Sequence, residues 1–242
     1  MRPLVIVPTY NERDNIPVVV ARLMAIPDVR VLVVDDGSPD GTGAVADAIA
    51  AGSGGRVSVL HRTGPRGLGV AYIDGMREAL ASDATHICQM DADLSHNPSD
   101  VARLLAATAD ADVVIGSRYV PDGRIENWPR RRRVLSAFAN WYIRTITGLR
   151  MRDCTSGFRC WRREGLERVP LERIASNGYA FLVELVWQAV ANGCRVGEVP
   201  ITFVERRQGA SKLSGHVILE SVIVPWQLAW RSLSRRLFRA TI

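Results

Sequence analysis

The sequence is poor in lysine and in cysteine. Arginine supplies 30 of its 31 basic residues, and Lys212 is its single lysine. The four cysteines lie far apart and form no Cys-x-x-Cys pair; they are Cys88, Cys154, Cys160 and Cys194. This spacing argues against a zinc site or a disulfide framework and fits a reducing compartment. The lone lysine suggests a position that requires a compact ammonium group rather than a planar guanidinium.

Several familiar sequence signals are also missing. No Gly-Lys-Ser or Gly-Lys-Thr triplet occurs, which excludes a Walker-type phosphate loop. The first predicted strand, Leu4–Val7, is followed by Pro8–Glu12 rather than by a Gly-x-Gly-x-x-Gly turn, which excludes a dinucleotide-binding fold. No apolar run reaches 18 residues, and the N-terminus lacks the apolar stretch of a signal peptide. We therefore expect no membrane-spanning helix.

The sequence has an ordinary globular composition with an excess of basic over acidic residues. Its 242 residues are 47% hydrophobic and 23% charged, with a net charge of +6. That length is ample for a sizeable core. The charge indicates an anionic partner, which could be nucleic acid, a membrane surface or a phosphorylated small molecule. Nucleic acid is not expected, because the basic residues cluster beside acidic segments and no known nucleic-acid motif occurs.

Short apolar runs alternate with helix-like segments through the first half of the chain. The predicted strands cover residues 4–7, 29–34, 57–60, 85–90 and 112–116, and a last strand is predicted at 199–203. Helices are predicted between them from about residues 16, 43, 70 and 99. This rhythm indicates an α/β fold with a doubly wound, mostly parallel sheet and helices on both faces.

Acidic and polar residues follow three of the predicted strands. Tyr10–Glu12 follow the first, Asp35 and Asp36 the second, and Asp91 and Asp93 the fourth. Right-handed crossovers place the carboxyl ends of parallel strands at one edge, so we expect these side chains to converge in the ligand crevice there. Two carboxylates one residue apart suit a divalent cation shared with nucleotide phosphates. The alternative is that both only cap the next helix.

Three motifs carry a resemblance to a known family. The segments Val7–Glu12, Val34–Thr42 and Met90–His96 resemble those of family 2 glycosyltransferases with the GT-A fold. Met90–His96, taken with Gly116–Tyr119 and Gly209–Lys212, is closer to the polyprenol-phosphate (dolichol-phosphate) mannose synthases. The resemblance runs over nearly the whole chain and predicts a GT-A domain at residues 1–215, followed by a C-terminal tail at 216–242.

The resemblance implies a site for a nucleotide-sugar donor. The residues implied in it are Pro8, Tyr10, Glu12, Val34, Asp36, Asp91, Ala92, Asp93, Arg206 and Lys212. Asp91 and Asp93 would hold Mg²⁺ or Mn²⁺, with Asp93 as the direct ligand. Arg206 and Lys212 belong to a small, polar segment typical of a loop that closes over a diphosphate, whose charge they would neutralise.

Arginines also gather after the predicted sheet. Such a run is usually a solvated face, but it could also receive a phosphorylated acceptor or anionic lipid headgroups. The resemblance implies that Arg118, Arg132 and Ser136 bind an acceptor phosphate. The helix predicted at about 134–147 carries an apolar stripe, which we expect to be core. Further along, Glu184 is either a buried, paired structural acid or a sugar ligand.

The tail from residue 217 is rich in apolar and aromatic residues, with arginines late in it. Pro225 is expected to interrupt it, so it is too short and too broken to span a bilayer. Amphipathic helices that lie in the membrane interface would have this composition. A terminal helix packed on the sheet would explain it equally well.

Together, the residues and the resemblance predict a metal-dependent, inverting polyprenyl-phosphate (dolichyl-phosphate) β-D-mannosyltransferase with GDP-mannose as the donor. Its predicted catalytic residues are Asp93, Arg118, Arg132, Ser136, Arg206 and Lys212. The protein is predicted to lie on the cytoplasmic face of a membrane as a peripheral protein. A membrane-embedded protein is an optional partner. One alternative is a UDP-glucose-dependent polyprenyl-phosphate glucosyltransferase. Another is a non-catalytic, membrane-docked module that binds nucleotide sugars, although binding alone requires no stabilisation of a leaving group.

Overall fold

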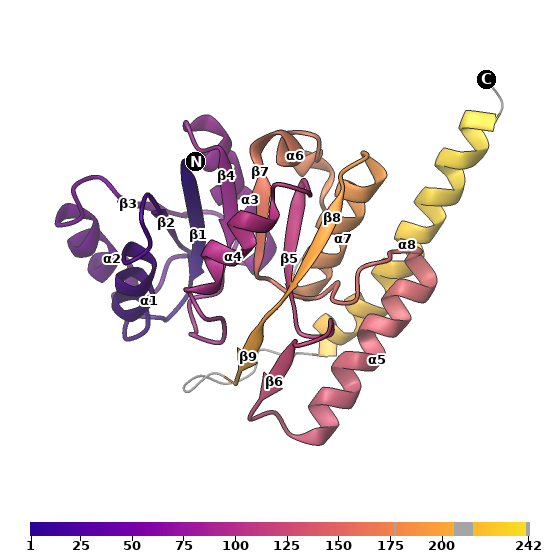
Figure 1. Ribbon diagram of the computed structural model, residues 1–242, viewed down its shortest axis with the longest axis horizontal. Helices are drawn as coiled ribbons and strands as arrows, with labels where there is room; N and C mark the ends of the chain where they lie inside the picture. Colours follow the sequence, from indigo (N-terminus) through magenta and orange to yellow (C-terminus); the bar gives the residue numbers. More distant parts are fainter. Residues whose placement is uncertain (177, 206–214, 241–242) are drawn as a thin grey trace.

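A seven-stranded sheet forms the centre of the molecule (Figure 1). The computed structural model describes residues 1–176, 178–205 and 215–240. The strand order is β3-β2-β1-β4-β7-β5-β8, and β7 is antiparallel to both of its neighbours whereas the other pairs are parallel. The strands are β1 Pro3–Thr9, β2 Arg30–Asp35, β3 Val57–His61, β4 His86–Gln89, β5 Val113–Ser117, β7 Arg159–Arg162 and β8 Val196–Pro200. The predicted mostly parallel α/β sheet is confirmed.

Helices cover both faces of this sheet because its strands are apolar on both sides. Leu4 and Ile6 of β1 pack in one core cluster with residues of α3 and α7. Val5 and Val7, which alternate with them, pack in a second cluster with residues of α1 and α4. The helices are α1 Ile16–Met24, α2 Thr42–Ala51, α3 Leu68–Ala81, α4 Asp100–Ala107, α5 Arg130–Thr147, α6 Arg163–Glu167, α7 Gly178–Ala191 and α8 Gly215–Ala240.

Two strands lie where the sequence predicts none. β7 contains Arg159, which is fully buried and donates hydrogen bonds to the carbonyl oxygens of Cys154, Ser156 and Leu182. A charged residue in a buried strand breaks the apolar pattern that identifies such strands in a sequence. β6 (Arg124–Glu126) is short and mostly exposed, and it pairs in parallel with β9 (Thr202–Val204) in a separate small sheet. The predicted strand at 199–203 is therefore divided between β8 and β9.

The last helix, α8, lies beside α5 and packs on α7 at one end of the molecule (Figure 1). It continues through Pro225, so the predicted interruption there is wrong. Val224 and Leu228 on either side of the proline are buried against residues of α5 and α7, and this packing holds the helix together despite the missing backbone donor. Among the described residues, none of the helices combines the length and the apolar character needed to cross a bilayer.

The apolar stripe of α5 is exposed, contrary to the prediction that it is core. Leu135, Phe138 and Trp141 are 63%, 56% and 58% exposed. Only Asn140 and Ile143 of the 18 residues in this helix are buried. The helix packs on the rest of the molecule through one narrow side, because it extends beyond the sheet together with α8 (Figure 1). Its apolar stripe is thus available to another partner.

Candidate active site

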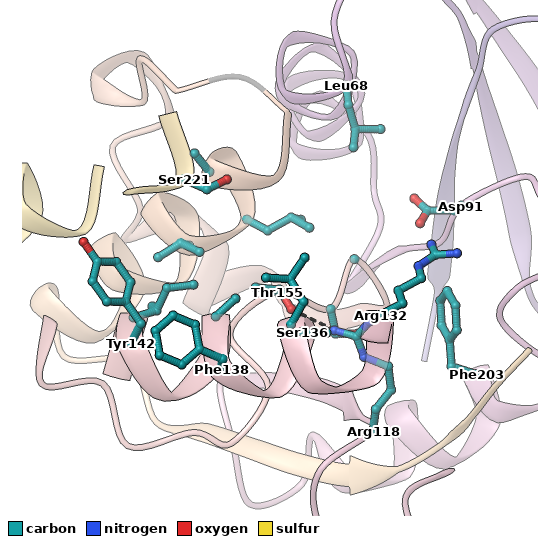
Figure 2. Close-up of a pocket in the computed structure, with 18 of the residues that line it drawn as sticks. Leu68, Asp91, Arg118, Arg132, Ser136, Phe138, Tyr142, Thr155, Phe203 and Ser221 are labelled. Carbon is teal, nitrogen blue, oxygen red and sulfur yellow. Dashed lines mark hydrogen bonds between the residues drawn. The ribbon is translucent and has the colours of Figure 1, made fainter. Parts of the chain in front are cut away.

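A cavity of about 310 Å³ opens beyond the carboxyl end of β4 and reaches between α5, α7 and α8 (Figure 2). Its charged end contains two carboxylates and two guanidinium groups, from Asp91, Asp93, Arg118 and Arg132. Its other end is mainly apolar and is lined by side chains that include Leu135, Phe138, Tyr142, Ile143, Val183, Val222 and Val224. Such a cavity fits a ligand with a charged head and an apolar tail.

The two acids of the predicted metal site are held by neighbouring hydroxyl groups. The Tyr72 hydroxyl donates to Asp91 Oδ1 at 2.9 Å. Burial, and then the nearby Asp91 carboxylate, raise the pKa of Tyr72 well above its usual range, so this hydroxyl keeps its proton. Asp93 Oδ1 accepts hydrogen bonds from the backbone N–H and the hydroxyl of Ser95, at 3.0 and 2.5 Å. The turn after β4 therefore fixes both side chains.

The surroundings of Asp91 leave room for a ligand, and the histidine next to it is neutral. A Cβ atom at Gly157 would lie 3.4 Å from both carboxylate oxygens of Asp91, so the glycine keeps that side open. His96 Nδ1 lies 4.0 Å from Asp91 Oδ2, and burial lowers the pKa of His96, which keeps the imidazole neutral near pH 7.

The donor set at this point fits a hard divalent cation. The described residues contain no group of three or more histidine, cysteine, aspartate or glutamate side chains that could hold a metal alone. Asp91 and Asp93 nevertheless offer oxygen ligands, and Mg²⁺ in particular is usually held by one or two carboxylates together with substrate phosphates. Asp91 and Asp93 are thus suitable ligands for a cation that arrives with a nucleotide diphosphate. Their role as metal ligands stays a prediction.

The predicted residues on the nucleotide side lie at the carboxyl ends of β1 and β2. The Arg66 guanidinium lies over the ring of Tyr10, 5.0 Å from its centroid, and donates to its hydroxyl. Asp36 is buried and forms an ion pair with Arg62, and it also accepts a hydrogen bond from Gly67 N at 2.8 Å. These contacts connect β2 to the loop before α3, and Tyr10 and Asp36 are not among the residues that line the cavity.

The remaining predicted donor residues lie around the same strand ends. Pro8 and Val34 are register partners on β1 and β2. The side chain of Val34 is fully buried in the core, so a ligand could meet only its backbone. Glu12 is half-buried and accepts a hydrogen bond from Asn15 Nδ2 at 2.7 Å, and Ala92 is buried. Their contacts with a nucleotide stay predictions.

The predicted acceptor residues line the charged end of the cavity, and both arginines are paired. Arg118 donates from Nε and Nη2 to the two carboxylate oxygens of Asp153, each at 2.7 Å. Arg132 Nη1 donates to Glu205 Oε1 at 2.7 Å. Figure 2 shows the two arginines side by side, with Arg132 pointing toward Asp91. Ser136 is half-buried on the same wall, one turn of α5 after Arg132.

Aromatic rings lie against the guanidinium groups of these arginines. The Arg132 guanidinium carbon lies 4.0 Å from the ring centroid of Trp128, which is a close cation–π contact. Arg118 lies 5.8 Å from the same centroid and 5.4 Å from that of Phe203. Trp128 and Phe203 meet edge to face, with their ring centroids 5.3 Å apart. The rings hold two positive charges close together in one wall of the cavity.

Two further predictions have different outcomes. Glu184 is buried and accepts hydrogen bonds from Ser176 N and Oγ, at 3.0 and 2.6 Å, and from Arg231 Nη1 at 2.8 Å. It is the paired structural acid of the two alternatives, and it does not line the cavity. Arg206 and Lys212 lie outside the described residues, so their roles stay predictions.

Several side chains that contact the predicted site residues are not evident from the sequence. Tyr72 lies on the apolar face of α3 and resembles a core residue in the sequence pattern. Trp128, Thr155 and Phe203 come from three segments that only the fold brings together at Arg118.

Comparison with known proteins finds a matching family and similar curated proteins. A profile described as Glycosyl transferase family 2 matches residues 4–174. A polyprenol monophosphomannose synthase from Mycolicibacterium smegmatis is 50% identical over 234 residues, covering 95% of this chain and 88% of that protein. An undecaprenyl-phosphate mannosyltransferase from Micrococcus luteus is 47% identical over 242 residues, covering 98% of this chain and 99% of that protein.

Solved structures show the same fold at lower identity. Glucosyl-3-phosphoglycerate synthase from Mycobacterium tuberculosis, in complex with Mn²⁺, UDP and phosphoglyceric acid, is 19% identical with a TM-score of 0.66, covering 92% of this chain and 78% of that chain. The mannosyltransferase PcManGT from Pyrobaculum calidifontis, in complex with GDP-Man and Mn²⁺, is 18% identical with a TM-score of 0.59, covering 97% and 74%. At these identities the likeness establishes the fold.

Proposed function

Because the chain belongs to glycosyl transferase family 2, we propose that it transfers mannose from GDP-mannose to a polyprenyl monophosphate, with inversion at the anomeric carbon. The observation that carries this proposal is the cavity, whose charged end joins two carboxylates to two arginines and whose other end is apolar. A phosphate on a long isoprenoid chain matches both ends. The two relatives named as mannosyltransferases of polyprenyl phosphates cover nearly the whole chain and support the same acceptor.

The donor side has a clear chemical task. Asp91 and Asp93 would hold Mg²⁺ or Mn²⁺ beside the diphosphate of GDP-mannose, and the bound cation would supply Lewis-acid stabilisation of the leaving group. Tyr72 and Ser95 orient the two carboxylates by hydrogen bonds. Because His96 is neutral, it does not compete with the cation for the negative charge of Asp91. Arg206 and Lys212 remain the proposed partners of the leaving diphosphate.

The acceptor side requires no protein base. A phosphate monoester has its second pKa near 6, so the attacking oxygen is already anionic near neutral pH. The protein must instead hold this anion next to the anomeric carbon of an anionic donor. Arg118, Arg132 and Ser136 would do this at the charged end of the cavity, where guanidinium groups suit a phosphate geometrically.

The transfer reaction itself tests the proposal. Radiolabelled GDP-mannose and a short polyprenyl phosphate should give label in the lipid phase, and EDTA should remove this activity. UDP-glucose serves as the control donor, because the same fold occurs in structures with UDP-glucose bound. Label from UDP-glucose alone would retain the family and contradict the proposed donor. Absence of transfer from both donors would contradict the proposed reaction for the isolated chain.

The exposed side chains of α5 and α8 support a membrane as the source of the acceptor. Trp226 and Trp230 of α8 are 61% and 73% exposed, and Trp141 of α5 is 58% exposed. The Trp226 indole donates to the Tyr142 hydroxyl at 2.9 Å, which connects the two helices. Aromatic side chains beside arginines are typical of helices that lie at an anionic membrane surface. We therefore propose that α5 and α8 dock there as a peripheral membrane attachment.

Removal of two of these indoles should release the protein from vesicles. The double variant Trp141→Ser and Trp230→Ser is expected to bind vesicles of phosphatidylcholine and phosphatidylglycerol roughly a hundred-fold or more weakly, since each of the two buried aromatic side chains contributes about 1.5–3 kcal/mol. Cosedimentation measures the change. Val18→Ser on α1, at the opposite end of the sheet, is the matched control because Val18 is also exposed. Equal losses in both proteins would contradict docking through α5 and α8.

A further inference from the structure

The two arginines at the charged end of the cavity have counter-ions of different kinds. The Arg118–Asp153 pair is buried, with side chains 8% and 0% exposed. The Arg132–Glu205 pair is half-exposed, with side chains 27% and 35% exposed. A buried pair is costly to break, whereas a half-exposed pair contributes little and can exchange one partner for another. Only the second pair therefore suits a contact that opens and closes during a reaction cycle.

Arg132 is held in place by more than this ion pair. The Trp128 ring lies under its guanidinium at 4.0 Å, and Phe203 supports that ring edge to face. Trp128 is 9% exposed, so the platform is part of the packed structure. If Glu205 leaves, the cation–π contact still orients the guanidinium toward the cavity. The edge of Arg132 that Glu205 occupies then becomes available to another oxyanion.

Glu205 is anchored by its backbone next to the cavity. It follows β9 directly, and its N–H donates to the carbonyl oxygen of Glu126 on β6 at 3.2 Å. Arg132 and Phe203, on either side of this position, line the cavity. The carboxylate thus lies beside the point where an acceptor phosphate would meet Arg132. We propose that Glu205 is an internal counter-ion of Arg132 that the phosphate of the acceptor displaces, an inference that rests on the proposed function.

This exchange would make Glu205 a residue that determines acceptor specificity. A phosphate monoester is a dianion near neutral pH and can accept two parallel hydrogen bonds from a guanidinium, so it outcompetes a single carboxylate. A phosphate diester carries one negative charge and gains little over Glu205. The carboxylate therefore favours monoesters over diesters at this arginine, at the expense of some affinity for both.

Binding of a soluble monoester to the full chain tests the inference. We expect Glu205→Gln to bind geranyl phosphate about two- to five-fold more tightly than the wild type in calorimetry, the size of effect that a half-exposed ion pair allows. Its preference for geranyl phosphate over the methyl diester of geranyl phosphate should fall. Glu126→Gln removes the same charge from the exposed neighbouring strand and should change neither value.

A second variant distinguishes displacement of Glu205 from Arg132 from a general effect of removing a negative charge. In Arg132→Gln the substitution Glu205→Gln should have no further effect, because the two side chains act on each other. Unchanged or weaker binding by Glu205→Gln, or no binding by either protein, would overturn the inference. Tighter binding without any mannose transfer by the wild type would instead overturn the proposed function alone, since this binding requires no catalysis.

Discussion

Asp93→Ala is expected to abolish mannose transfer, with a loss of at least about 10²–10³-fold in rate. Asp93 lies at the charged end of the cavity, where its carboxylate is fixed by two hydrogen bonds from Ser95. In the proposed reaction it is the direct ligand of the cation that stabilises the leaving diphosphate. Its loss removes that stabilisation from the transition state. Transfer of radiolabelled mannose at saturating donor and acceptor measures the effect.

Two companion variants show whether the charge or the fold is responsible. Asp93→Asn keeps an oxygen that can accept the hydrogen bonds of Ser95 but lacks the negative charge, so it should be nearly as inactive as Asp93→Ala. Asp110→Ala removes an exposed acid before β5 and should transfer like the wild type. Nucleotide binding gives an independent readout, because Mn²⁺ should strengthen GDP binding by the wild type and not by Asp93→Ala. Retained metal-dependent turnover in Asp93→Ala would remove Asp93 from the mechanism.

The acids of the site could be predicted because a simple rule places them. Parallel strands end at one edge of a sheet, so acids dozens of positions apart, such as Asp36 and Asp91, lie at the same edge. Their support could not be predicted in the same way. Tyr72 holds Asp91 from the apolar face of α3, and in a sequence an apolar helix face indicates core rather than a contact to a carboxylate.

For the arginines too, the residues could be predicted but their partners could not. Arg118 and Arg132 follow from the resemblance to the family, but their counter-ions lie 35 and 73 residues further along the chain, and only the fold pairs them. The α5 stripe shows another limit. Periodicity identifies the residues that share a helix face, but it does not say whether a second element covers that face. Phe138 and Trp141, whose ring centroids lie 5.5 Å apart, share a face as predicted and are exposed, because α5 extends beyond the sheet.

Loss of the buried ion pair between Arg118 and Asp153 should lower the stability of the protein strongly. Asp153 is fully buried and accepts hydrogen bonds from Arg118 Nε, Nη2 and the backbone N–H of Arg118. Asp153→Asn leaves a buried guanidinium without its counter-ion, so the free energy of unfolding should fall by about 3–5 kcal/mol. For a domain of this size the melting temperature should then fall by about 6–20 °C. Thermal unfolding followed by circular dichroism measures it.

Acidification should reveal the same pair in the wild type. Burial by itself would raise the pKa of Asp153, but the charge and hydrogen bonds of Arg118 hold that pKa below its usual value. A lowered pKa stabilises the folded state above the pKa of an unfolded aspartate, near 3.9, and this contribution is lost as the pH falls through the lower folded value. The melting temperature of Asp153→Asn should therefore fall less steeply below about pH 4 than that of the wild type.

Glu205→Gln, whose ion pair is half-exposed, should lose less than about 1 kcal/mol of its free energy of unfolding at neutral pH. Equal melting temperatures for Asp153→Asn and Glu205→Gln would contradict the distinction between a fixed and an exchangeable arginine, on which the proposed displacement of Glu205 depends.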